Sequence, residues 1–184
     1  MNLLASSGQL RASFMRWTLV CVPAVVLLGF LSGKMAQSDP ENPWFAALVK
    51  PGAYPPPATF GIVWTVLYVL MGLALAMVVA ARGAKGRGLA MLAFIVQFML
   101  NLAWSPVFFG AHQITGGLIV IGLLDLMAIV TTALFYRVRP VAAALLVPYL
   151  LWLFFATWLN YVILQANPAM DGADVAPAVE RFQI

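Results

Sequence analysis

The sequence contains very little charge. Only 9% of its 184 residues are Asp, Glu, Lys or Arg, whereas about a quarter of the residues in soluble domains are charged. Hydrophobic residues make up 64% of the chain, and the mean hydropathy is +0.97. Because a soluble fold of this length could not bury so much apolar surface, the composition predicts a single-domain polytopic membrane protein whose main partner is the lipid bilayer.

Groups that carry out catalysis or bind metals are also scarce. Cys21 is the only cysteine and His112 the only histidine, which excludes an internal disulfide and a thiolate metal cluster. The sequence has no Ser-His-Asp set, no HExxH motif, no phosphate-binding glycine loop and no carboxylate pair. It therefore predicts no catalytic residue and no metal site. It also has no basic run interleaved with aromatic residues, which excludes nucleic acid as a partner.

The apolar residues fall into five stretches, each long enough to cross a bilayer, for which about 20 residues are needed. These stretches are residues 13–32, 59–81, 89–109, 117–136 and 141–165. The predicted fold class is an all-α membrane protein, with a bundle of five transmembrane helices formed by residues 13–165. Residues 1–12 are expected to be an N-terminal extension, and residues 166–184 a disordered polar tail.

The longest loop, residues 33–59, is rich in proline. Asn42 as an N-cap and Pro43 at the first helical position predict a short helix at residues 43–49. The three prolines at 55–57 stiffen the chain before the second span. Because a loop this long usually has a function of its own, we expect it to act as a lid.

Basic residues predict the orientation of the bundle. About seven of the Lys and Arg residues lie in the N-terminal segment and in the turns 82–88 and 137–140, against about three elsewhere. The positive-inside rule places these segments in the cytoplasm and the first loop outside. A helical bundle is typical of the inner rather than the outer bacterial membrane, so we expect the protein there.

Aromatic and amide side chains share one face of the third span. Phe94, Gln97, Asn101, Trp104 and Phe108 follow each other at steps of three or four residues, which places them on one side of a helix. In lipid, an amide needs another helix or a bound molecule as its partner. This stripe therefore predicts a cavity inside the bundle.

Two further spans carry similar faces. These are Phe60, Trp64, Tyr68 and Met71 in the second span, and Tyr149, Trp152, Ala156, Leu159 and Asn160 in the fifth. Walls of this kind suit flat aromatic ligands, because rings stack on rings. The alternative is that the rings only pack the bundle and that each amide is an interhelical hydrogen bond worth about 0.6–2 kcal/mol.

Asp125 lies near the middle of the fourth span. A charge at the bilayer centre costs roughly 2.5–3.5 kcal/mol on insertion scales, so such a residue either functions or has a partner. The functional interpretation is a proton or cation relay, or a contact to a ligand. The structural one is a protonated or hydrogen-bonded acid that packs against a neighbouring helix.

Four segments between residues 44 and 161 share a distinctive set of aromatic, proline and asparagine residues. They are Trp44-x3-Leu48-x-Lys50-Pro51-x3-Pro55-Pro56, Trp64-Thr65-x-Leu67-Tyr68-x2-Met71-Gly72, Asn101-x2-Trp104-x-Pro106-x-Phe108-Phe109-Gly110 and Pro148-Tyr149-Leu150-x-Trp152-x3-Ala156-x2-Leu159-Asn160. In this order they resemble the TspO/MBR family, the tryptophan-rich sensory or translocator proteins, also known as peripheral-type benzodiazepine receptors.

The resemblance implies a five-helix membrane bundle, often dimeric, whose first loop closes a ligand pocket. Family members bind tetrapyrroles such as protoporphyrin IX, and several bind cholesterol or isoquinoline carboxamide and benzodiazepine drugs. It therefore implies a porphyrin-like ligand, with no cofactor required, and a role in sensing, sequestering or transporting porphyrins. The macrocycle would stack on Trp64, Trp104 and Trp152, and Asn101 would orient it.

The aromatic faces and the resemblance together give the candidate ligand-binding residues. They are Trp44, Phe60, Trp64, Tyr68, Gln97, Asn101, Trp104, Phe108, Trp152 and Ala156. Trp44 lies in the first loop, where it is either part of the pocket rim or an anchor at the membrane interface.

Three other functions stay open. The resemblance extends to bacterial relatives for which light-dependent porphyrin degradation is proposed, and such an enzyme would use Trp64 and Trp152. A proton-coupled small-molecule transporter would use Asp125. A scaffold would act through protein partners alone.

Two features of the family are missing. No Lys or Arg follows shortly after Tyr161, so the sterol-binding pattern is absent, which argues against a sterol as ligand. Leu92 and Val96 stand where some family dimers use a Gly-x3-Gly pair. The resemblance therefore leaves a homodimer undecided.

Overall fold

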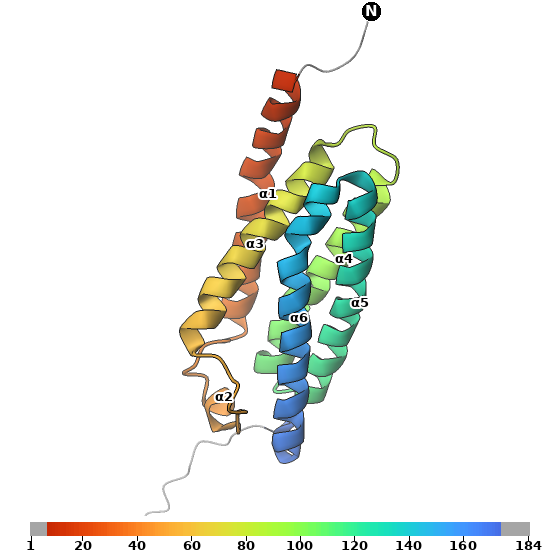
Figure 1. Cartoon of the computed structure of the whole chain (residues 1–184). Coiled ribbons are helices and arrows are strands. Elements are labelled where there is room, and N and C mark those ends of the chain that lie inside the picture. Colours follow the sequence, from red (N-terminus) through yellow and green to blue (C-terminus); the bar gives the residue numbers. More distant parts are fainter. Residues whose placement is uncertain (1–6, 174–184) are drawn as a thin grey trace, which may run out of the picture.

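The computed structural model describes residues 7–173 as a bundle of long helices (Figure 1). In chain order the elements are α1 (Ser7–Met35), α2 (Pro43–Ala47), α3 (Pro57–Ala80), α4 (Arg87–Ser105), the π-helical turn η1 (Pro106–Gly110), α5 (Ile114–Val138), α6 (Pro140–Ala166) and the 3₁₀ turn η2 (Pro168–Met170). Five of these helices are long and apolar enough to cross a membrane. The predicted all-α membrane fold with five spans is confirmed.

The five long helices surround a common interior. α1 packs on α3, α3 on α6, α6 on α5 and α5 on α4, and α4 returns to α1. The core between them is apolar and aromatic, with Met71, Phe94, Phe135 and Leu153 fully or almost fully buried. The outer faces are covered with exposed Leu, Ile, Val and Met side chains, as expected where the solvent is lipid.

Prolines and an asparagine define the ends of several helices. Asn42 caps α2, because its side-chain oxygen accepts the backbone N–H of Phe45 at 3.0 Å, and Pro43 occupies the first turn. Pro140 also begins its helix, where the missing N–H is harmless. Pro106 ends the regular part of α4, and its carbonyl accepts from Ala111 at 2.8 Å, the wide spacing of a π-turn.

The helices extend further than the hydropathy predicted. α1 begins at Ser7 and ends at Met35, whereas the first span was expected at residues 13–32. The expected N-terminal extension 1–12 therefore enters the helix at residue 7, and residues 1–6 lie outside the described part. The physical reason is that hydropathy marks the part of a helix that crosses hydrocarbon, while backbone hydrogen bonding continues into the polar interface.

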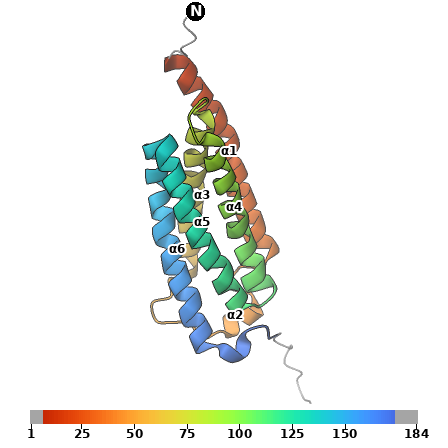
Figure 2. The ribbon, with the colours of Figure 1, turned by 90° about the vertical axis from the view of Figure 1, so that its right-hand side faces the viewer.

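The C-terminal residues also differ from the expectation. Residues 166–184 were expected to form a disordered polar tail, but residues 167–173, here called the strap, fold back beneath the bundle toward α2 (Figure 2). The strap is held by hydrogen bonds of Asn167 and Asp171 to the first loop and to α5. The rest of the expected tail, 174–184, lies outside the described residues.

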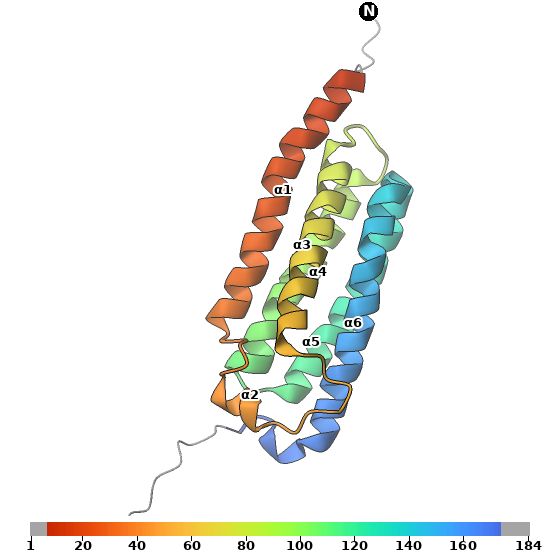
Figure 3. The same ribbon diagram turned by 60° about the vertical axis from the view of Figure 1, so that its left-hand side comes forward.

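The first loop, residues 36–56, closes the lower end of the bundle as seen in Figure 3. From α2 it runs across to the lower part of α6 and then rises into α3. The side chain of Asn167 holds the loop through both backbone groups of Val49, accepting from its N–H at 2.8 Å and donating to its carbonyl at 2.9 Å. We call this loop the lid.

Candidate functional site

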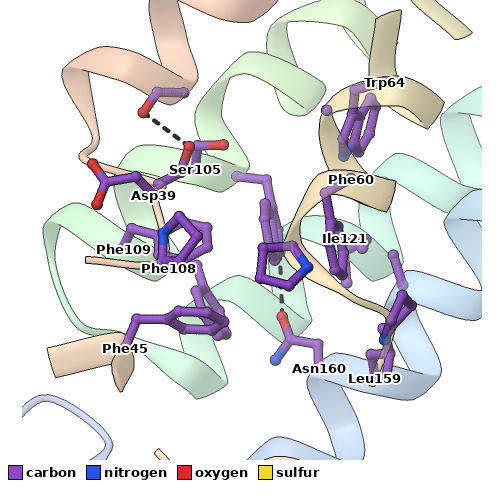
Figure 4. Close-up of a pocket in the computed structure, with 18 of the residues that line it drawn as sticks. Asp39, Phe45, Phe60, Trp64, Ser105, Phe108, Phe109, Ile121, Leu159 and Asn160 are labelled. Atoms are coloured by element: carbon purple, nitrogen blue, oxygen red, sulfur yellow. Dashed lines mark hydrogen bonds between the residues drawn. The ribbon is translucent and has the colours of Figure 1, made fainter. Parts of the chain in front are cut away.

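A cavity of about 1030 Å³ lies between the lid and the helices. Side chains from α1, α3, α4, α5, α6 and the lid all contribute to its wall, and Figure 4 shows several of them pointing into the same space. This volume is at the upper end of the roughly 300–1,000 Å³ of ligand pockets. The cavity is therefore large enough for a sizeable small molecule.

Aromatic rings form much of the wall. The rings that line it are Phe30, Phe45, Tyr54, Phe60, Trp64, Tyr68, Trp104, Phe108, Phe109 and Trp152. Neighbouring rings also contact each other: Tyr54 stacks on Phe60 with centroids 5.2 Å apart, and the edge of Phe60 meets Trp152 at 5.7 Å. The rings support one another, and their remaining faces are available to a flat ligand.

A chain of hydrogen bonds crosses the bundle at Asn101. The Tyr68 hydroxyl donates to Asn101 Oδ1 at 3.2 Å, and Asn101 Nδ2 donates to the Tyr149 hydroxyl at 3.2 Å. That hydroxyl in turn donates to Gln97 Oε1 at 2.9 Å. The chain joins α3, α4 and α6, and it fixes the orientation of the Asn101 amide and the Tyr68 ring, which both line the cavity.

Asn160 forms a second polar bridge, drawn with its dashed bond in Figure 4. Its Oδ1 accepts the indole N–H of Trp104 at 3.2 Å, and its Nδ2 donates to the Ile114 carbonyl at 3.0 Å. A Cβ on Gly117 would lie 3.0 Å from Asn160 Oδ1 and 2.9 Å from the Phe108 ring. A glycine here lets the bridge and the aromatic wall approach α5 closely.

The Trp152 indole N–H differs from these groups. It is buried and has no hydrogen-bond partner among the described residues, although the Trp152 side chain lines the cavity. A buried donor without a partner costs about 1–3 kcal/mol.

The lid brings a lysine and a tyrosine to the cavity. Lys50 Nζ donates to the carbonyls of Phe45 at 2.7 Å and Leu48 at 3.2 Å, and it lies 4.5 Å from the centroid of the Phe45 ring. Burial lowers the pKa of Lys50. Burial also raises the pKa of Tyr54 to about 12, so its phenol stays protonated and uncharged at neutral pH.

Charge is confined to the mouth of the cavity. Lys34, Asp39 and Lys50 are the charged residues in its lining. The Lys34 ammonium has no hydrogen bond or ion pair within residues 7–173, and the last carbonyls of α1 are already bonded to backbone N–H groups. Lys34 therefore offers an unused positive charge to a ligand.

Most of the candidate residues line the cavity. Those that do are Phe60, Trp64, Tyr68, Asn101, Trp104, Phe108, Trp152 and Ala156. Gln97 lies outside the lining: only 1% of it is exposed, and it is hydrogen-bonded to Tyr149. Gln97 lies one turn before Asn101 on α4, on the side away from the lid.

Trp44 also lies outside the lining, and it is neither a rim residue nor an interface anchor. It is 2% exposed, and it stacks on His112 with centroids 4.8 Å apart. Its indole N–H donates to the Met170 carbonyl at 3.2 Å. Its ring also meets the Phe108 ring of η1 edge to face, with centroids 5.5 Å apart, so Trp44 fastens the lid to η1 and to the strap.

Sequence reasoning missed part of the wall. Phe45 and Tyr54 come from the lid, and their aromatic character within the expected lid was a usable signal. Phe30, Ile121 and Leu124 complete the lining from α1 and α5. Those residues resemble all other apolar residues of their helices, so the sequence carries no signal that they face a cavity.

Asp125 lies on α5 outside the lining, next to Leu124. Its Oδ2 accepts the Thr157 hydroxyl of α6 at 2.8 Å, and its Oδ1 is buried without a partner among the described residues. This hydrogen bond supports the interpretation of Asp125 as an acid that packs against a neighbouring helix. Nowhere in residues 7–173 do three or more His, Cys, Asp or Glu residues come close enough to hold a metal ion.

Comparison with known proteins identifies the family. Residues 20–166 match the sequence model of the TspO/MBR family. The chain is 40% identical over 150 residues to the tryptophan-rich protein TspO of Chlorobaculum tepidum, covering 81% of this chain and 94% of that protein. It is 38% identical over 136 residues to the translocator protein of Homo sapiens, covering 73% and 80%. It is 39% identical over 124 residues to the tryptophan-rich sensory protein of Cereibacter sphaeroides, covering 67% and 77%. The chain therefore belongs to the TspO/MBR family.

Proposed function

We propose that this membrane protein binds a flat tetrapyrrole of the porphyrin type and serves to sense, sequester or transport it. The observation that carries the proposal is the cavity of about 1030 Å³ walled by aromatic rings from α1, α3, α4, η1, α6 and the lid. A macrocycle buries a large flat apolar face, which such walls accept by stacking. The names of the relatives, sensory protein and translocator protein, agree with a role in signalling or movement of a small molecule.

Different residues of the cavity wall would have different roles in binding the ligand. Trp64, Trp104 and Trp152 supply the stacking surfaces. Asn101 would act by holding Tyr68 in place, because its Oδ1 and Nδ2 are already bonded to Tyr68 and Tyr149.

The mouth of the cavity suits the carboxylates of a porphyrin. A macrocycle that enters with its apolar edge would leave its propionates near Lys34 and Lys50, which both line the cavity. An exposed ion pair of this kind is worth about 0.2–1 kcal/mol. The charges would therefore set the direction of entry more than the affinity.

Titration of the purified protein with protoporphyrin IX in nanodiscs, followed by porphyrin absorbance, tests this proposal. Trp64→Ala and Trp152→Ala should each weaken binding about tenfold, the equivalent of ~1.4 kcal/mol for one lost ring contact. Trp158→Ala is the matched control on α6, because Trp158 is 44% exposed and does not line the cavity. Wild-type affinity in both cavity variants would show that the porphyrin does not bind there.

A light-dependent degradation of the porphyrin is a second candidate. It is favoured by the position of Trp64 and Trp152, since both candidate residues line the cavity. Illumination of the complex in the presence of dioxygen, the oxidant such a reaction needs, should then produce new absorbance bands. These bands should be lost in Trp152→Phe if the protein is an enzyme. Equal bleaching in wild type and variant would leave binding as the function.

A further inference from the structure

The end of the bundle opposite the lid is strongly basic. In Figure 1 the turn between α3 and α4 and the first residues of α1 lie at one end, and α2 lies at the other. The basic end holds Arg11, Arg16, Arg82, Lys85, Arg87, Arg137 and Arg139. The acids of the described chain are elsewhere: Asp39 and Glu41 in the lid, Asp125 within α5 and Asp171 in the strap.

Three of these arginines meet at one hollow. A cavity of about 370 Å³ is lined by Arg16 of α1, Arg82 after α3 and Arg139 between α5 and α6. Gln9, Leu10, Ser13, Ala80 and Ala81 complete its lining. The lining thus combines three solvent-exposed arginines from separate parts of the chain with polar and apolar residues.

These guanidinium groups lack acidic partners. Arg16 Nε donates to the Ala12 carbonyl at 3.3 Å within its own helix, and no ion pair involves Arg16, Arg82 or Arg139 in the part of the chain that the structure describes. Arg87 shows the contrast, since it donates to the carbonyls of Val78 and Val79 and so caps α3. Arg87 therefore has a structural role, whereas the three lining arginines have positive charges without an acidic partner and N–H groups that can still donate hydrogen bonds.

We propose that Arg16, Arg82 and Arg139 form a binding site for a phosphate-bearing anion. Guanidinium groups match phosphate in charge and in the geometry of their paired donors. The site lies where transmembrane helices end, at the level of lipid headgroups, and basic pockets between such helices bind anionic headgroups. Leu10, Ala80 and Ala81 would contact the apolar part of a lipid next to its phosphate. The headgroup of an anionic phospholipid is the favoured source, and a free phosphate ester is the other.

Lipid exchange into nanodiscs tests the site. The full-chain protein is placed in phosphatidylcholine discs with a rising fraction of phosphatidylglycerol, and bound lipid is counted by native mass spectrometry. Arg16→Gln, Arg82→Gln and Arg139→Gln should each weaken retention of phosphatidylglycerol about fivefold, the effect of one basic residue near a membrane surface. The corresponding Lys variants should keep much of the binding, because the charge remains.

Arg137→Gln is the matched control. Arg137 lies at the same end, in the last turn of α5, and it does not line the cavity. Its substitution by Gln therefore removes the same charge without changing the lining of the site. Unchanged stability of each Gln variant to unfolding in mixed micelles shows that the bundle is intact. In a second series, inorganic phosphate in solution replaces phosphatidylglycerol, and its binding to the wild type and the Gln variants is measured. If the three lining variants weaken the binding of phosphate but not that of phosphatidylglycerol, the site belongs to a soluble anion. Equal losses in Arg137→Gln and the three lining variants, for either anion, would overturn the proposal.

Discussion

The hydroxyl of Tyr149 is the central member of the buried chain of hydrogen bonds that also includes Asn101 and Gln97. It accepts from Asn101 and donates to Gln97 Oε1, and Tyr149 is 1% exposed. The Gln97 amide nitrogen already lacks a partner in the described chain. No water can compensate for a further loss at this depth, so the chain depends on each of its members.

Tyr149→Phe should therefore lower the free energy of unfolding by about 1–2 kcal/mol, because it leaves buried amide groups of Gln97 and Asn101 without a partner. Unfolding in mixed micelles with increasing sodium dodecyl sulfate measures the loss. Tyr161→Phe is the control on the same helix, since Tyr161 is 51% exposed and should lose almost nothing. Equal stability of the two variants would contradict the importance of the chain.

At this scale the sequence predicted faces but not partners. The spacing of Gln97, Asn101 and Trp104 placed amides and rings on one side of α4, and Asn101 and Trp104 do line the cavity. The sequence could not show that Tyr68 and Tyr149 would occupy the Asn101 amide. Periodicity fixes the direction of a side chain from its own helix, whereas its partner depends on how the helices are rotated against each other.

Gly72 lets the backbones of α1 and α3 approach each other closely. A Cβ on Gly72 would lie 2.6 Å from Val22 Cα, a distance that only movement of a helix backbone could relieve. Small residues let transmembrane helices approach in this way, and the resulting packing replaces the hydrophobic effect that is absent in lipid.

Gly72→Ala should push α1 away from α3 and lower the free energy of unfolding by about 1–3 kcal/mol, as overpacking does in other cores. Gly61→Ala is the control on the same helix. A Cβ on Gly61 meets nothing within 4 Å, so alanine there should stabilise α3 slightly through its higher helix propensity. Both are measured by unfolding in mixed micelles. Equal effects of the two substitutions would show that α1 can shift freely.

The start of α5 is capped from the strap. Asp171 Oδ1 accepts the backbone N–H groups of Ile114 at 2.6 Å and Thr115 at 3.1 Å, and Oδ2 accepts the Thr115 hydroxyl at 2.5 Å. Burial acts to raise the pKa of Asp171, but these hydrogen bonds outweigh it and lower the pKa below 3.8. A carboxylate also suits the positive end of the helix dipole.

Asp171→Ala should speed amide hydrogen exchange of Ile114 and Thr115 about tenfold at pH 7, the equivalent of ~1.4 kcal/mol for a lost cap. Because the folded pKa is the lower one, the charge contributes fully above the unfolded pKa of about 3.9 and loses its effect as pH falls through the folded value. The difference from wild type should therefore disappear in strong acid. Asp39→Ala, in the lid, should leave these amides unchanged. A difference that persists below the folded pKa would contradict the assignment.

Elements with their own hydrophobic period were predictable, and the strap was not. The long helices follow from apolar runs, and α2 follows from Asn42 and Pro43. The strap is short and polar, which locally indicates disorder. What orders it are contacts far away in the chain, such as those of Asp171 with α5 and of Asn167 with Val49, and a local pattern contains no information about them.

For the whole molecule, the cavity was predictable as a convergence of faces but not as a volume. The aromatic stripes of α3, α4 and α6 do meet, as expected from their periods. The apolar contributions of α1 and α5 include Phe30, Ile121 and Leu124, ordinary residues of apolar helices. The basic hollow was not predictable from the sequence either. Its three arginines are far apart in sequence, and only the packing of the helix ends brings them together.

The ends of the bundle differ in charge, and this difference predicts the orientation in the membrane. The positive-inside rule places the basic end in the cytoplasm and the lid outside.

Cysteine labelling tests this orientation. Cys21 is the only cysteine, so a Cys21→Ala chain can receive one reporter thiol at a time. Gly52→Cys in the lid and Gly88→Cys at the start of α4 form a matched pair, since both positions are exposed and have open space for a side chain. In intact bacterial spheroplasts, a membrane-impermeant maleimide should label Gly52→Cys at once and Gly88→Cys only after permeabilisation. The reverse order would place the lid, and with it the mouth of the cavity, on the cytoplasmic side, and the ligand would then have to come from within the cell.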